Sequence, residues 1–248
     1  MKIKKYMHFF QGWKLYHRDL RRYKKLEKDS RYSEFKIYGK NKLPVVYDRF
    51  EMAGKIDGHY FFQDIFMAKE IFKCAPKDHF DIGSRLDGFI THLLSFRENV
   101  TMIDIRPLPF EVMGLTFLQS DATNLSEIES STVESISSLH AIEHFGLGRY
   151  GDPVDPAAWE KVLYAMQRVT KTGGRLYISV PIGRKNVLCF NAHRVFEIHT
   201  IPRHLDKCKL VKFAYIKEGK IIEVDLKEFP SFQVDADYLC GCYIFEKS

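Results

Sequence analysis

Short apolar runs alternate with segments of helical periodicity over most of the chain. Seven runs have the length and the β-branched or aromatic content of strands; one ends at Ile82, and the others span 100–104, 115–121, 133–139, 175–181, 209–216 and 238–245. Two segments, 59–72 and 155–171, have the spacing of helices. Strands that alternate with helices predict an α/β fold with a mostly parallel sheet.

The helix predicted over 155–171 carries the clearest boundary residues. Asp155 is a natural N-cap, and Pro156 suits the first helical position. Gly173 and Gly174 follow the apolar stripe and predict the end of this helix.

The first strand runs into a glycine turn, Asp81-Ile82-Gly83-Ser84, and a helical pattern begins at Phe89. Small ligands bind at the carboxyl ends of the strands in open parallel sheets, and glycine there allows a ligand to approach the backbone closely. The order strand, glycine turn, helix therefore predicts a ligand site, although one glycine after a strand is as often a plain turn.

The N-terminal segment has an aromatic stripe. Its members follow one another at spacings of three and four residues: Tyr6, Phe9, Trp13, Tyr16, Leu20, Tyr23 and Leu26. The opposite face is basic, so residues 1–58 are predicted to be a basic, amphipathic helical extension of a domain over 59–248. Three roles remain open: docking on its own domain or on a second copy as a homodimer, peripheral contact of residues 1–30 with an anionic membrane surface, and nucleic-acid binding.

The formal net charge of +6 is concentrated in that extension. Residues 1–30 hold ten Lys and Arg against three Asp and Glu, whereas the other 218 residues hold 28 against 29. A neutral body offers no broad phosphate-binding surface, which disfavours nucleic acid as a partner.

The cysteines and the hydropathy pattern indicate in which cellular compartment the protein is expected. The five cysteines are scattered, and Cys240 and Cys242 share one face of a strand, which makes a bridge between them awkward. Free thiols suit a reducing compartment. The sequence contains neither an apolar run of about 18 residues nor a signal-peptide pattern, so a cytoplasmic location is expected.

The order of these parts resembles the class I S-adenosylmethionine-dependent methyltransferases over roughly residues 60–248. The shared marks are the turn at 81–84, Asp104 at the end of the second strand, Asp121 just after the third, and LHAIEHFG at 139–146 after the fourth. The resemblance implies a Rossmann-like, mostly parallel sheet of seven strands with an antiparallel last strand. The sequence departs from the usual G-x-G-x-G, because residues 83–88 read GSRLDG.

The same resemblance implies S-adenosylmethionine as the cofactor. Asp104 would accept hydrogen bonds from both ribose hydroxyls, and Asp121 would accept one from the adenine amino group. An NAD enzyme would need the phosphate-cradling G-x-G-x-x-G, which this turn lacks. The expected cofactor-binding residues are Asp81, Gly83, Ser84, Asp104, Ile105, Asp121 and Ala122.

A second group of candidate residues follows the fourth and fifth strands. His140, Glu143 and His144 occupy the place where some metal-dependent O-methyltransferases carry E-x-x-E-H, and His193 follows later. These four are expected to be catalytic, either as ligands of a divalent metal or with a histidine as general base. His140 to His144 also fit the H-x-x-E-H of zinc hydrolases, but that pattern needs a continuous helix, and three glycines follow at once.

The segment 143–156, EHFGLGRYGDPVDP, is similar to bacterial methyltransferase-like proteins associated with surface-polysaccharide synthesis. The resulting hypothesis is an O-methyltransferase that acts on a hydroxyl of a sugar or sugar nucleotide. Two alternatives stay open: an RNA methyltransferase that uses the basic extension, and a catalytically degenerate binding module.

Overall fold

The computed structural model describes residues 2–29, 37, 39, 42–51, 56, 58–96 and 99–248, without the side chains of 2–5 and 28–29. The chain divides into two compact units, Met1–Ile56 and Asp57–Ser248. Each unit is described by itself below.

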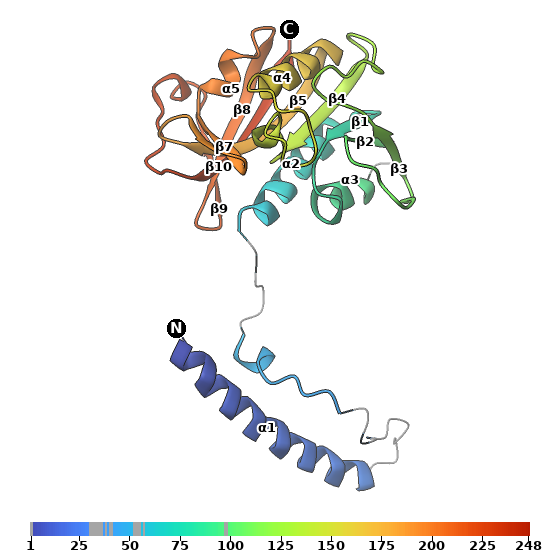
Figure 1. Cartoon of the computed structure of the whole chain (residues 1–248), viewed down its shortest axis with the longest axis vertical. Helices are drawn as coiled ribbons and strands as arrows, with labels where there is room; N and C mark the ends of the chain where they lie inside the picture. Colours follow the sequence, from blue (N-terminus) through green and yellow to red (C-terminus); the bar gives the residue numbers. More distant parts are fainter. Residues whose placement is uncertain are drawn as a thin grey trace. The chain divides into compact units, whose positions relative to one another are not determined.

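The larger unit is built on one mixed sheet with the strand order β3-β2-β1-β4-β5-β10-β8-β9 (Figure 1). The strands on this path are β1 (His79–Ile82), β2 (Val100–Asp104), β3 (Leu115–Gln119), β4 (Val133–Leu139), β5 (Thr170–Gly183), β8 (Cys208–Lys217), β9 (Lys220–Val224) and β10 (Leu239–Lys247). The first five strands in the order run parallel, and β10 is antiparallel to both of its neighbours. The predicted Rossmann-like α/β fold with an antiparallel last strand is confirmed.

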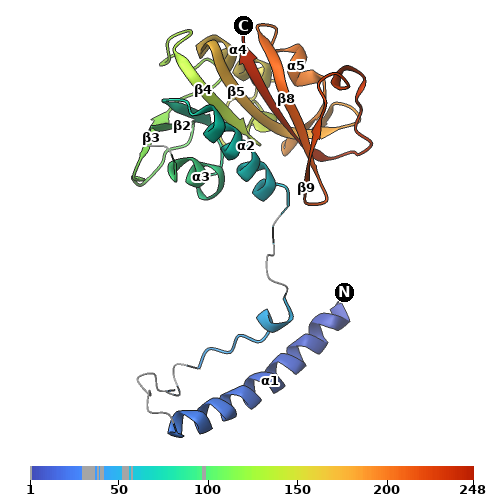
Figure 2. The same ribbon diagram turned by 180° about the vertical axis from the view of Figure 1, so that it is seen from behind.

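Helices cover both faces of the sheet. On one face lie α2 (Tyr60–Cys74) and α3 (Thr91–Leu94), which is preceded by a π-helical turn η3 (Leu86–Ile90); on the other lie α4 (Ala158–Val169) and α5 (Thr200–Arg203) (Figure 2). Each face has its own apolar core. Phe89, Leu93 and Met67 are fully buried on the first face, and Val162, Leu163 and Met166 on the second. This three-layer arrangement leaves the carboxyl ends of the parallel strands along one edge of the unit.

All seven strands expected from the sequence are present, and three further strands were missed. Two of them, β6 (Val187–Cys189) and β7 (His193–Glu197), form a short hairpin whose second strand continues beside the end of β5. The third, β9, is joined to β8 by Glu218 and Gly219, both at positive φ. Such a two-residue turn favours Asn-Gly or Asp-Gly, so Glu-Gly gave little indication of a hairpin.

The boundaries predicted for the helix at 155–171 were wrong by a few residues. Asp155 accepts a hydrogen bond from the N–H of Ala157 at 2.9 Å, but the helix α4 begins only at Ala158. It ends at Val169, where the Thr170 hydroxyl donates to the carbonyl of Met166 and the backbone becomes extended. Gly173 and Gly174 therefore lie inside β5 and do not stop the helix.

The smaller unit contains α1 (Lys2–Asp29) and a short turn η2 (Asp48–Phe50). The segment 42–51 packs along the helix: a Cβ atom at Gly12 would overlap the carbonyl of Val46, and the ring of His8 stacks on Phe50 at 4.4 Å. Tyr6 and Phe10 nevertheless stay about two-thirds exposed. No helix in the described part of the chain is long and apolar enough to cross a membrane. Part of the extension predicted over 1–58, including residues 30–36 and 52–55, lies outside the described residues.

Candidate active site

Two adjoining cavities open at the carboxyl ends of the parallel strands in the larger unit. The first, of about 280 Å³, is called the acidic cavity because Asp104, Asp121, Asp152 and Asp155 line it. The second, of about 430 Å³, is called the histidine cavity because His140, Glu143, His144 and His193 line it. Both cavities are lined by Gly83, Arg106, His140, His144 and Tyr150. A ligand in one cavity would therefore meet a ligand in the other along these shared residues.

The turn after β1 lies between the two cavities and the buried core. Gly83 adopts a φ of +68°, donates its N–H to the carbonyl of Ile103, and lines both cavities. Asp81 lies fully buried beneath it, where the backbone N–H and hydroxyl of Ser84 and the hydroxyl of Ser137 donate to its carboxyl group. Burial raises the pKa of Asp81 to about 6, against the effect of these donors.

Asp81 itself lines neither cavity, while Ser84 lines the histidine cavity. The carboxyl group of Asp81 is used to hold the turn, so its expected contact with a methionine ammonium group stays a prediction.

The acidic cavity contains the remaining expected cofactor residues, Asp104, Ile105, Asp121 and Ala122. Asp104 ends β2 and is paired with Arg106, whose Nε and Nη2 donate to its two oxygens at 2.9 and 2.6 Å. The Arg106 side chain is half exposed and also lies over the ring of Tyr150 at 4.6 Å. The carboxylate expected to meet ribose hydroxyls is thus already paired with a half-exposed guanidinium.

The histidine cavity is organised by a buried pair that follows β4. His140 adopts a positive φ of 50°, and the chain then forms one 3-10 turn, η4 (Ile142–His144). This turn brings the Nδ1 atom of His140 to 2.8 Å from Oε1 of Glu143, and the two side chains are only 2% and 1% exposed. No continuous helix carries His140 and His144, so the geometry of an H-x-x-E-H zinc hydrolase is absent from these described residues.

His144 is placed by a different contact. Its Nδ1 atom lies 2.7 Å from the carbonyl oxygen of Ala192, which also accepts a hydrogen bond from Arg149. A carbonyl only accepts, so the 2.7 Å contact places the proton on Nδ1, and the approach of the Arg149 Nη1 atom to within 3.3 Å of Nδ1 is then not a hydrogen bond. Nε2 keeps a lone pair and lies 3.7 Å from Oε1 of Glu143. Burial lowers the pKa of His144, which favours the neutral ring.

Arg194 holds the loop around η4 through its backbone carbonyls, a role that the sequence did not predict. The guanidinium is buried and donates to the carbonyl oxygens of Glu143 and Phe145, at 3.3 and 2.6 Å. Asp152 also holds the loop, since its carboxylate accepts hydrogen bonds from the N–H groups of Gly146 and Gly148. Two charged residues therefore hold the backbone around η4, and Asp152 is engaged with the loop.

His193 begins β7 and lines the histidine cavity with the other three predicted catalytic residues. Its ring lies 5.6 Å from that of Tyr238, which precedes β10. The sequence gave no reason to expect Tyr238 at this site, because the loop before β10 bore no recognisable motif.

His59 is a further residue that the sequence did not single out. It precedes α2, and its ring stacks on that of His140 with centroids 4.4 Å apart and planes at 25°. Burial, together with a smaller effect of the neighbouring His140, lowers the pKa of His59 to about 4. The positions 59 and 140 are far apart in the sequence, so only the fold reveals the pair.

Similarity to known proteins was found at the level of fold. A family model described as "Caenorhabditis protein of unknown function, DUF268" matches residues 115–212, which run from β3 into the first half of β8 and include η4. No curated protein matches the sequence.

Solved structures that share this fold include S-adenosylmethionine-dependent methyltransferases and a cyclase. The N-methyltransferase NodS from Bradyrhizobium japonicum WM9, in complex with S-adenosyl-L-homocysteine, has a TM-score of 0.53 and 13% identity, over 77% of this chain and 89% of that one. The 1,6-didemethyltoxoflavin N1-methyltransferase of Burkholderia thailandensis has a TM-score of 0.53 and 12% identity, over 76% and 79%. The [4+2]-cyclase SpnF has a TM-score of 0.54 and 9% identity, over 78% and 84%.

The larger unit therefore has the fold of the class I S-adenosylmethionine-dependent methyltransferases. At 9–13% identity these likenesses show the fold alone. They do not include the surface-polysaccharide proteins that the segment 143–156 resembles.

Proposed function

We propose that this protein is an S-adenosylmethionine-dependent O-methyltransferase that acts on a hydroxyl of a sugar or sugar nucleotide used in surface glycan synthesis. The observation that carries the proposal is the meeting of the two cavities. The acidic cavity contains the carboxylates at the ends of β2 and β3, and the histidine cavity contains the candidate bases. They share Gly83, His140 and His144, so a methyl donor in one can reach an acceptor in the other.

The residues that line the acidic cavity fit the proposed cofactor. Asp104 offers two carboxylate oxygens to the ribose hydroxyls once Arg106 turns away, and Asp121 and Ala122, which follow β3, line the same cavity. S-adenosylmethionine carries no phosphate, so a turn with few glycines, such as the one at Gly83, is sufficient to accommodate it. When bound, it supplies an electrophilic methyl group on its sulfonium.

The chain itself would bind the acceptor and remove its proton. The hydrogen bond from Nδ1 of His144 to the carbonyl oxygen of Ala192 orients the ring and leaves the lone pair on Nε2. The Nε2 atom can therefore accept the proton of an acceptor hydroxyl. Burial favours the neutral form of His144 that this step requires. Arg149 and Tyr150 line the same cavity and can donate hydrogen bonds to the oxygens of a sugar.

Titration calorimetry of the full chain with S-adenosylmethionine and with S-adenosylhomocysteine tests the cofactor. Binding of both, followed by transfer of a labelled methyl group to members of a sugar-nucleotide panel, is the expected result. Absence of cofactor binding would contradict the proposal and favour the degenerate binding module. Cofactor binding with salt-dependent retention and methylation of RNA, but not of sugars, would favour the nucleic-acid alternative.

A further inference from the structure

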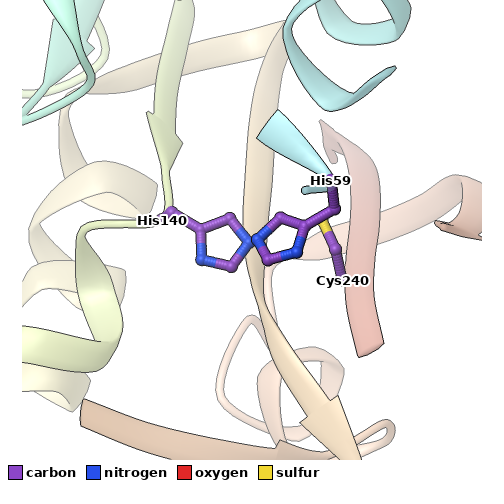
Figure 3. A group of neighbouring side chains, drawn as sticks. All are labelled: His59, His140 and Cys240. Carbon is purple, nitrogen blue, oxygen red and sulfur yellow. The ribbon is translucent and has the colours of Figure 1, made fainter. Parts of the chain in front are cut away.

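Three potential metal ligands from distant parts of the chain meet beside the histidine cavity. Figure 3 shows His59, just before α2, and His140, at the end of β4, with their rings directed toward one another and Cys240 of β10 next to them. One ligand atom from each of the three side chains lies within 4.8 Å of the other two. The cluster joins the start of a helix, the end of a parallel strand and the antiparallel strand.

The two imidazoles have ring nitrogens that nothing else uses. The Nε2 atoms of His59 and His140 are buried, and neither has a hydrogen-bond partner among the described residues. A buried polar atom without a hydrogen-bond partner destabilises the folded chain, so two of them side by side call for a ligand. A cation placed between them would satisfy both.

Glu143 gives His140 the form that a metal ligand needs. Its Oε1 atom lies 2.8 Å from Nδ1 of His140, so that nitrogen donates and Nε2 keeps its lone pair toward the cluster. A carboxylate behind a ligating histidine is the usual outer partner in metal sites. Glu143 therefore has an orienting role here, in place of the direct ligation expected from the sequence.

The ligand types select the metal. Two imidazoles and a thiolate suit Zn²⁺, whereas Mg²⁺ and Ca²⁺ prefer oxygen ligands. Zinc–ligand bonds of about 2.0–2.3 Å place tetrahedral ligand atoms about 3.5 Å apart, so the present set must close by roughly an ångström through rotation of the rings. The Cys240 thiol, which now lies 3.4 Å from Oε1 of Gln63, would release its proton to solvent on binding.

We propose that His59, His140 and Cys240 bind one zinc ion through Nε2, Nε2 and Sγ. The fourth position would lie toward the histidine cavity, because Tyr60 and Tyr238 line that cavity and their rings lie 4.7 and 6.0 Å from His59. Three protein ligands with one open position are typical of catalytic zinc. A water or hydroxyl bound there becomes more acidic. The site does not depend on methyl transfer.

Cobalt substitution of the metal-depleted full chain tests the site, because Co²⁺ bound to a thiolate gives a charge-transfer band in the near ultraviolet. The expected result is one Co²⁺ per chain with this band, displaced by one equivalent of Zn²⁺. Cys240→Ser should abolish the band, and His59→Gln should weaken binding strongly while the melting temperature without metal stays close to that of the wild type. Glu143→Gln should weaken binding by ~10–100-fold as an outer partner.

Cys189→Ser and His92→Gln are matched controls, since both residues lie outside the cluster, and both should leave the band and the affinity unchanged. The assignment would be overturned if Cys240→Ser kept the band. It would also be overturned if Co²⁺ binding were lost in His144→Ala and His193→Ala but kept in His59→Gln. Since His59→Gln changes a half-buried residue, it keeps the test valid if the fully buried Cys240→Ser fails to fold. Cofactor calorimetry on the same variants separates this site from the proposed activity.

Discussion

The Nδ1 atom of His140 lies 2.8 Å from Oε1 of Glu143, and both side chains are almost completely buried at the end of β4. The Oε2 atom of Glu143 has no hydrogen-bond partner among the described residues. Burial of such a pair lowers the stability of the fold, so its presence indicates a functional role. The pair lines the histidine cavity and His140 stacks on His59, so it belongs to both the proposed acceptor site and the proposed metal site.

Substitution of Asp104 tests the ribose contact. Asp104→Ala should lower the affinity for S-adenosylhomocysteine by about 2–3 kcal/mol, because two charge-assisted hydrogen bonds are lost. Asp235→Ala, which removes an exposed carboxylate far along the chain, is the matched control in calorimetry. Equal affinities in the two variants would refute the assignment.

Arg106 should oppose cofactor binding, because its guanidinium occupies both oxygens of Asp104. Arg106→Ala should therefore raise the affinity, by no more than about 1 kcal/mol, since the arginine is half exposed. The same calorimetric titration measures this gain. A loss of affinity would mean that Arg106 contacts the cofactor itself.

His144 is expected to act as the general base. His144→Ala should lower turnover by ~100-fold or more and leave cofactor affinity nearly intact. Because burial lowers the pKa of His144 below 6.5, wild-type turnover should fall on acidification only below that value, where the ring gains a proton. His204→Ala, on a half-buried histidine outside both cavities, is the control. Normal turnover in both His144→Ala and His193→Ala would remove the histidine cavity from the mechanism.

Asp81 should make stability depend on pH. Its folded pKa of about 6 lies above the usual 3.8, so between these values the folded chain holds a proton that the unfolded chain has released. The contribution of Asp81 to stability should therefore be greatest below about pH 4 and fall, by about 2–3 kcal/mol, as pH rises through about 6. Asp81→Asn should lack this loss relative to the wild type in urea unfolding from about pH 4 to about pH 7. Asp225→Asn, which changes an exposed carboxylate, is the control. If the free energy of unfolding changed with pH to the same extent in the wild type and in Asp81→Asn, the assignment would be contradicted.

The exposed aromatics of α1 are expected to bind anionic membrane surfaces. Tyr6 and Phe10 are 68% and 70% exposed, and residues 1–30 carry seven net positive charges. The full chain should co-sediment with anionic but not zwitterionic vesicles, and the double variant Tyr6→Ser/Phe10→Ser should bind less. Phe72→Ser changes an aromatic on α2 that is 61% exposed, and it should have no effect. If deletion of residues 1–30 causes aggregation instead, docking of the stripe on protein is favoured.

The sequence by itself determined the fold class and most of its strands. Alternation of apolar runs such as 100–104 and 133–139 with helical segments is a local signal, because each strand must bury its own side chains in the layered core. The positions of Asp104, Asp121, Glu143 and His144 followed from the same logic, since residues just past parallel strands gather at one edge of the sheet.

Only the tertiary structure decided what those residues contact. Asp81 turned out to hold Ser84 and Ser137, Asp104 to pair with Arg106, and His140 to stack on His59. Hydrogen-bond partners and burial depend on chain segments that lie far apart in sequence, and no local pattern encodes them. His59 and Cys240 carried no motif, because a site assembled from the start of α2, the end of β4 and strand β10 exists only once the antiparallel strand has been inserted beside β5.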